Sequence, residues 1–235
     1  MKKKIGMIVG VLVGLFVIWF GYLFITSYIE NTKLLKEMDC VYELLDVEEL
    51  DIEKINEHLN KTVTKGDYGK IEQAAKSYIR DFVTLTSAFT EWSQDEQFVQ
   101  VLTVENYQLD GPQFTKTNEY LKEKRDSLEE IEKEYKDLMT DTRKDSYIMD
   151  LELDSVYVDI YNQDLMGDFE ELRTDKELQN IFSDLTNILN VYDEAISFLR
   201  ENASEWTIEN NTLIFTNDNL LNEYNTIIDQ IDNEK

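Results

Sequence analysis

The sequence contains very few of the residues on which common catalytic and metal sites depend. Its 235 residues include one cysteine, Cys40, and one histidine, His58. A lone cysteine cannot close an intrachain disulfide, so a disulfide-stabilised extracellular fold is excluded. One histidine and one cysteine are also too few for the usual zinc site or for the two Glu-x-x-His motifs of a di-iron bundle. We therefore predict no metal site, no cofactor and no catalytic residue.

Motifs for phosphate binding and for serine hydrolysis are missing as well. The sequence has no P-loop, no G-x-G-x-x-G and no G-x-S-x-G. Carboxylate pairs are common, but neighbours such as Glu129 and Glu130 on a helical face are typical of a solvated surface. Glycosidase chemistry needs two carboxyl groups facing one cleft. A carboxylate-dependent envelope hydrolase is kept only as an alternative, which a cleft with facing carboxyls and apolar walls would favour.

Basic residues are scarce, with 23 Lys and Arg against 49 Asp and Glu. Three of the basic residues precede residue 5, so the remaining chain carries 20 basic and 49 acidic residues, a net charge of −29. Such a charge repels nucleic acid and anionic lipid headgroups, and we predict no nucleic-acid partner. Apolar residues nevertheless recur at regular spacing and there is one proline, which favours a folded body over a disordered one.

One long hydrophobic run is present, from Ile5 to Ile25. Its 21 residues carry no charge, and as a helix they would span roughly 31 Å, close to the hydrocarbon thickness of a bilayer. The run is longer than the apolar region of a signal peptide, and no small-x-small cleavage site follows it. We therefore predict a retained transmembrane helix over residues 5–25, in contact with the lipid bilayer.

The orientation of this predicted span follows from the lysines beside it. Lys2, Lys3 and Lys4 come immediately before the run, and basic residues favour the cytoplasmic side. We predict a cytoplasmic tail at 1–4, a transmembrane helix at 5–25 that continues as a helix to about residue 50, and an extracytoplasmic acidic helical domain at 51–235. The predicted location is the cell membrane, with a single span and the N-terminus inside.

Apolar spacings of three and four residues dominate the chain after the run, which indicates helices. Trp206–Ile208 and Leu213–Phe215 alternate instead and flank Asn210 and Asn211, which predicts a β-hairpin. The predicted fold is mainly α: an antiparallel helical bundle with a small β-hairpin near the C-terminus. The expected helices cover about 52–59, 71–92, 114–138, 147–165, 175–202 and 218–231, with a loop at 61–69, a short helix after Asp95 and a turn at Asp110-Gly111-Pro112.

The segment after Phe114 has the most regular pattern. Its apolar residues step by three and four alternately as in a coiled-coil seam, and only Thr117 and Lys124 interrupt them. We expect this helix to pack inside a bundle. The aromatic residues, including Trp92 and Tyr107, fall mostly on such stripes, and we expect them to fill the core.

The functional prediction is a non-enzymatic binding or interaction module at the cell envelope, with a protein partner of unknown identity. The anchor, the helical body and the missing catalytic motifs support it. One alternative is an extracytoplasmic sensor or accessory subunit of a membrane complex. Gly10 and Gly14, which form a G-x-x-x-G pair, would then contact a membrane partner. The hydrolase is the second alternative.

Overall fold

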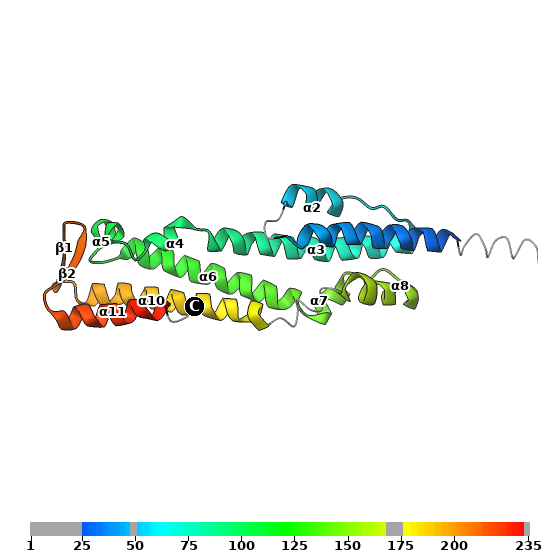
Figure 1. The fold of residues 1–235 in the computed structure, drawn as a ribbon. Helices are drawn as coiled ribbons and strands as arrows, with labels where there is room; N and C mark the ends of the chain where they lie inside the picture. Colours follow the sequence, from blue (N-terminus) through cyan, green and yellow to red (C-terminus); the bar gives the residue numbers. More distant parts are fainter. Residues whose placement is uncertain (1–24, 48–50, 168–175, 233–235) are drawn as a thin grey trace, which may run out of the picture. The chain divides into compact units, whose positions relative to one another are not determined.

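The computed structural model describes residues 25–47, 51–167 and 176–232 (Figure 1). The protein is mainly helical, at 77% helix, with a two-stranded antiparallel hairpin near the C-terminus. The predicted mainly α class is confirmed. The predicted span at 5–25 lies outside the described residues except for Ile25, and a search of the described helices finds none long and apolar enough to cross a membrane.

The chain divides into two compact units, and each is built from two separate stretches of sequence. Unit 1 comprises Met1–Val83 and Thr140–Glu171, and unit 2 comprises Thr84–Met139 and Leu172–Lys235. The long helix α3 (Gly66–Ser93) contributes residues to both units. The two units are described separately below.

Unit 1 consists of two longer helical segments and several short helices. A helix covers residues 25–45, as the predicted extension of the anchor requires, and its Leu34, Met38 and Val41 are fully buried. These residues therefore belong to the core of the unit. The other elements are α2 (Ile52–Leu59), the first part of α3, α7 (Asp141–Ser146), α8 (Ser155–Asp159) and the π-helix η1 (Ile160–Leu165).

The 25–45 helix and α3 run parallel to each other. Ser27 Oγ lies 3.0 Å from Tyr68 Oη, and further along both helices Glu37 Oε1 lies 2.8 Å from Lys76 Nζ. The parallel arrangement is possible because the connection at 46–65, which includes α2, is long. It returns the chain to the N-terminal end of the 25–45 helix, where α3 begins.

A buried ionic cluster joins these elements. Glu72 and Lys76, one turn apart on α3, are 0% and 1% exposed. The Lys76 ammonium donates to Glu72 Oε1 at 2.8 Å, to Glu37 Oε1 at 2.8 Å and to the Lys61 carbonyl at 2.9 Å. Glu37 also meets His58 Nδ1 at 3.1 Å. The single histidine is therefore placed beside a carboxylate on the rim of this cluster.

The loop at 60–65 between α2 and α3 depends on the same cluster. The Glu72 carboxylate accepts the backbone N–H groups of Val63 at 3.0 Å and Thr64 at 2.9 Å, and the Thr64 hydroxyl at 2.6 Å. Burial by itself would raise the pKa of Glu72. The hydrogen bonds from Lys76 and from the loop outweigh burial and hold the pKa below its ordinary value. Glu30 accepts Lys65 N at 2.8 Å in the same way.

Unit 2 is an antiparallel arrangement of long helices. Its elements are the end of α3, α4 (Glu96–Gln100), α5 (Val104–Asp110), α6 (Thr115–Leu138), α10 (Lys176–Glu201), β1 (Trp206–Glu209), β2 (Thr212–Phe215) and α11 (Asp218–Asp232). Arg125 on α6 donates to Asp193 on α10 at 2.6 Å, and the Tyr135 ring of α6 lies 5.4 Å from Phe182 of α10. Residue numbers increase along one helix as they decrease along the other, so α6 and α10 are antiparallel.

The hairpin connects α10 to α11. Trp206 pairs with Phe215 and Glu209 with Thr212. Asn210 and Asn211 form the two-residue turn with φ values of 50° and 60°, the left-handed region that asparagine tolerates and that a type I′ turn requires. Trp206 Nε1 donates to the Leu199 carbonyl at 2.7 Å. The hairpin therefore rests on the end of α10, as the marginal stability of an isolated hairpin requires.

Most predicted helices are confirmed, and two segments differ. The expected helix at 147–165 is confirmed only from Ser155 to Leu165, as α8 and η1. Before that the chain turns at 147–150, and Glu152 has a φ of 49°. The stretch before the predicted turn at Asp110-Gly111-Pro112 is helical, as α5. In contrast, the seam of α6 is confirmed in detail. Its buried residues are Thr117, Leu121, Lys124, Leu128, Ile131 and Leu138.

The cluster around Lys76 gives a first prediction. In Lys76→Met the buried carboxylate of Glu72 loses its cation, and we expect the free energy of unfolding to fall by about 3–5 kcal/mol. Lys70→Met is the matched control, because Lys70 is exposed and pairs with Asp67 one turn away at 2.7 Å. Its effect should stay below about 1 kcal/mol. Urea denaturation of the full chain, followed by circular dichroism, measures both, and equal losses would contradict the prediction.

Candidate binding cleft

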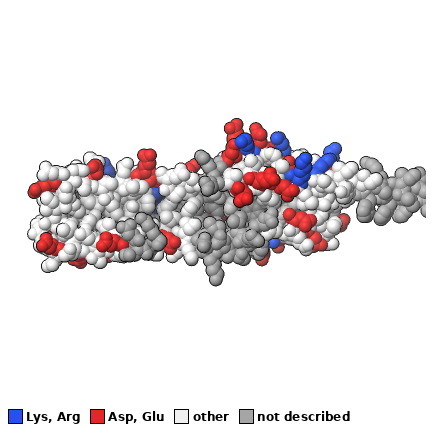
Figure 2. All heavy atoms as spheres, in the orientation of Figure 1, with Lys and Arg blue, Asp and Glu red and all other residues white. Residues whose placement is uncertain are grey.

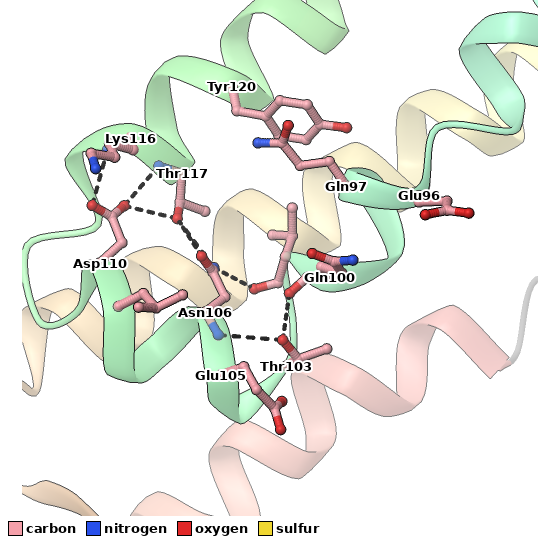
Figure 3. Close-up of a pocket in the computed structure, with 12 residues that line it drawn as sticks. Glu96, Gln97, Gln100, Thr103, Glu105, Asn106, Asp110, Lys116, Thr117 and Tyr120 are labelled. Carbon is pink, nitrogen blue, oxygen red and sulfur yellow. Dashed lines mark hydrogen bonds between the residues drawn. The ribbon is translucent and has the colours of Figure 1, made fainter.

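A cleft of about 850 Å³ lies in unit 2 between the short helices α4 and α5 and the first turns of α6 (Figure 3). Most of its lining residues have polar side chains, with carboxylates, primary amides and hydroxyl groups among them. The lining residues are Glu96, Gln97, Gln100, Val101, Thr103, Glu105, Asn106, Leu109, Asp110, Lys116, Thr117 and Tyr120. We refer to this set as the α4–α6 cleft.

Asp110 closes one end of the cleft by capping α6. The N-cap residue of α6 is Phe114, whose side chain cannot accept a hydrogen bond. Asp110 supplies the acceptor instead: its carboxylate receives Thr117 N at 2.8 Å, the Thr117 hydroxyl at 2.9 Å and Lys116 N at 3.3 Å. Burial would raise the pKa of Asp110, but these hydrogen bonds outweigh burial and lower the pKa. Asp110 is therefore ionised and engaged at neutral pH.

Asn106 and Thr103 fix the other wall. The Asn106 Nδ2 group donates to the Val101 carbonyl at 2.8 Å and to Thr117 Oγ1 at 3.1 Å. Thr103 caps α5 by accepting Asn106 N at 3.3 Å, and its hydroxyl donates to the Gln100 carbonyl at 2.7 Å. Figure 3 shows these bonds as one continuous chain from Asp110 to Gln100. Two helices of seven and five residues are held in place by this chain.

Lys124 does not line the cleft, but it contacts residues that immediately precede α4. It is buried at 7% exposure, and its ammonium donates to the Trp92 carbonyl at 2.6 Å, pairs with Asp95 at 3.1 Å and lies 4.4 Å from the centroid of the Trp92 ring. Asp95 caps α4 and accepts the Tyr120 hydroxyl at 2.7 Å. Burial, followed by the bond to Asp95, raises the pKa of Tyr120. This tyrosine is therefore a neutral hydrogen-bond donor.

Gly111 provides the close packing beneath the turn that joins α5 to α6. A Cβ atom at this position would lie 2.4 Å from the Tyr107 carbonyl oxygen and 3.0 Å from Trp206 Cη2. The Phe114 ring is fully buried and stacks 6.2 Å from the Trp206 ring. The turn therefore has no room for a side chain, and it fixes the start of α6 against the hairpin.

Several groups of the cleft are exposed to solvent. Glu96, Gln97, Gln100, Glu105 and Lys116 are exposed, and Leu109 is 86% exposed. Figure 2 shows acidic side chains scattered over the visible face of the molecule, so negative charge is a general property of the surface and not of the cleft alone. Such an arrangement suits reversible binding through hydrogen bonds and charge.

The lone cysteine and the lone histidine both lie in unit 1. Cys40 is half-buried on the 25–45 helix, and His58 contacts Glu37. Among the residues described by the structure, no group of three or more His, Cys, Asp or Glu side chains is placed to hold a metal ion. Glu129 and Glu130 are exposed, as expected for a solvated helical face.

Two polar residues in the otherwise apolar seam of α6 mark the cleft region in the sequence. Thr117 and Lys124 are the two polar interruptions of the α6 seam, one heptad apart. In the structure both are buried, and each hydrogen-bonds to the short helices that form the cleft or to the residues that cap them. A buried polar group needs a partner, so such interruptions indicate where a polar substructure packs on the helix.

Comparison with known proteins finds no matching family model, no matching curated protein and no matching solved structure.

The cap on α6 gives a second prediction. Asp110→Ala leaves the first N–H groups of α6 without an acceptor, and we expect a loss of about 1–2 kcal/mol in unfolding free energy at pH 7. Because the folded-state pKa lies below the ordinary value of 3.8, this stabilisation is complete above that value and is lost as the pH falls through the folded-state pKa.

Asp126→Ala is the control for this prediction. Asp126 is an exposed carboxylate on α6 that pairs with Lys122 one turn away, and its removal should cost less than about 0.5 kcal/mol. Urea denaturation of both variants and of the wild type between pH 3 and pH 7 measures the effect. A loss for Asp110→Ala that did not shrink in acid would contradict the capping role.

Proposed function

We propose that the protein is a membrane-anchored, extracytoplasmic, non-enzymatic binding module that uses the α4–α6 cleft. The observation that carries the proposal is the cleft itself. It is a hollow of about 850 Å³, within the size range of ligand sites, and it presents hydrogen-bonding groups on three elements that a dedicated network holds rigid.

The membrane anchor is proposed from the run Ile5–Ile25, with its N-terminus inside because Lys2–Lys4 precede it. The first described turn after the run supports this assignment. Ile25, Tyr28 and Ile29 are 62%, 73% and 45% exposed, and such apolar and aromatic side chains are favoured at a membrane interface. The buried face of the 25–45 helix would then tie the anchor directly to the core of unit 1.

Binding is favoured over hydrolysis by the state of the carboxylates. A glycosidase needs one carboxylic acid with a raised pKa. In the cleft, hydrogen bonds hold the pKa values of Asp110 and Glu105 below their ordinary values. Val101 and Leu109 are the lining residues with apolar side chains. The hydrolase alternative requires facing carboxyl groups between apolar walls. The sensor alternative keeps the same binding role and adds a membrane partner.

Topology provides the first test. In a Cys40→Ser background, Lys235→Cys should react with a membrane-impermeant maleimide on intact cells, whereas Lys3→Cys should react only after lysis. Cys40 is replaced because it is half-buried and would give an ambiguous background. Labelling of the Lys235→Cys variant only after lysis would rule out the proposed orientation.

Partner capture tests the binding role. The full chain, tagged at its C-terminus, is cross-linked in living cells, purified in detergent and analysed by mass spectrometry. We expect a protein partner in near-stoichiometric amount, because the α4–α6 cleft presents exposed hydrogen-bonding and charged groups. Recovery of lipid alone at stoichiometric level would overturn the binding module.

A further inference from the structure

We infer that the α4–α6 cleft binds a basic, extended segment of a partner protein. This inference rests on the proposed binding function and adds the chemistry of the ligand. Separate experiments test the binding function and the chemistry of the ligand, so that the failure of one is distinguishable from the failure of the other.

The charge of the cleft selects a cation. An anion would be expected to seek the free N–H groups at the start of α6, but the Asp110 carboxylate already occupies those of Lys116 and Thr117. Glu96 and Glu105 add two exposed carboxylates, against which Lys116 is the one ammonium in the lining. An anionic ligand would therefore meet repulsion from the carboxylates and would find the N–H groups of Lys116 and Thr117 occupied, whereas a cationic one meets complementary charge.

The amide groups of the cleft select a polypeptide rather than a simple amine. Gln97 and Gln100 are exposed on the same face of α4, and within the described chain neither side-chain amide makes a hydrogen bond. Each offers a donor and an acceptor, the pair of groups that an extended backbone requires. A simple polyamine has donors but no carbonyl, and it would leave the amide N–H groups without a partner.

Leu109 supplies an apolar contact at the same site. Its side chain is 86% exposed on α5 while lining the cleft beside Asp110. A leucine exposed to this degree gains from being covered, since burying it removes apolar surface from water. A segment that places Lys or Arg near Glu96 and Glu105 and an aliphatic side chain or stem over Leu109 satisfies all three kinds of group.

The overall charge of the protein affects the rate of such binding more than its specificity. The acidic body attracts any basic chain from a distance, with a strong dependence on ionic strength. Neutralising any one carboxylate on the surface weakens this long-range attraction to a similar extent, wherever the carboxylate lies. A test must therefore separate the cleft from the general field, and α6 offers a matched control pair in the exposed residues Glu129 and Glu130.

The first experiment titrates the full chain in detergent micelles with a fluorescent nonapeptide of alternating lysine and leucine, blocked at both ends, at 150 mM salt. Glu96→Gln/Glu105→Gln should weaken binding about tenfold, and Leu109→Ser should weaken it further. Glu129→Gln/Glu130→Gln removes the same charge and should change the affinity less than about twofold. Spermidine should bind more weakly than the peptide and should not distinguish the two double variants.

Equal weakening by the two double variants would mean attraction to the whole surface and would overturn the inference. Spermidine binding as tightly as the peptide, with the same sensitivity to Glu96 and Glu105, would also overturn it. All substituted residues are exposed, so the variants should retain wild-type circular dichroism.

The second experiment identifies the segment in cells. Benzoylphenylalanine replaces Leu109, or Glu130 as the control position, and the photo-cross-linked peptides are sequenced. Links from position 109 should fall in a segment rich in Lys or Arg, with far fewer links from position 130. A partner linked at 109 through a neutral or acidic segment overturns the inference and leaves the binding module intact. Absence of any partner in this experiment and in the capture overturns the binding module, and the inference with it.

Discussion

A buried N–H group without an acceptor destabilises a fold by about 1–3 kcal/mol, and both units of this protein meet that constraint with a carboxylate from another element. Glu72 accepts the backbone of the 60–65 loop in unit 1, and Asp110 accepts the first N–H groups of α6 in unit 2. Glu30 and Asp95 act similarly. The acidic composition is therefore partly structural, because several of the carboxylates hold short or irregular segments in place.

The same constraint explains how two very short helices can form the cleft. An isolated helix of five or seven residues is unstable in water. Here α4 begins at the Asp95 cap and α5 at the Thr103 cap, while Asn106 ties both to α6. Lys124 then binds the Asp95 carboxylate from the core side. These polar contacts act together with the buried side chains of Phe98 on α4 and Tyr107 on α5 to determine the geometry of the candidate site.

Sequence periodicity predicted the long helices, the seam of α6 and the hairpin, because each depends on local spacing and turn chemistry. It failed at 147–154, where apolar spacing continued but Glu152 adopts a left-handed conformation before α8 begins. It also missed α5, because the turn residues Asp110 and Gly111 obscured the helix before them. The cleft could not be predicted, since it depends on which elements pack together. The sequence feature related to the cleft is the pair of polar residues Thr117 and Lys124, which interrupt the seam of α6.

The interleaving of the two units has a consequence for biosynthesis. The first stretch of unit 1 ends at Val83, but its second stretch is not synthesised until residues 140–171. The first stretch of unit 2, Thr84–Met139, therefore leaves the ribosome before the second stretch of unit 1 is synthesised. Unit 1 is complete once residue 171 has emerged, whereas α6 waits for α10 to cover its seam. The apolar seam of α6 therefore lacks its α10 partner while residues 139–175 are being synthesised, and an uncovered apolar face makes a nascent chain prone to aggregation during that interval.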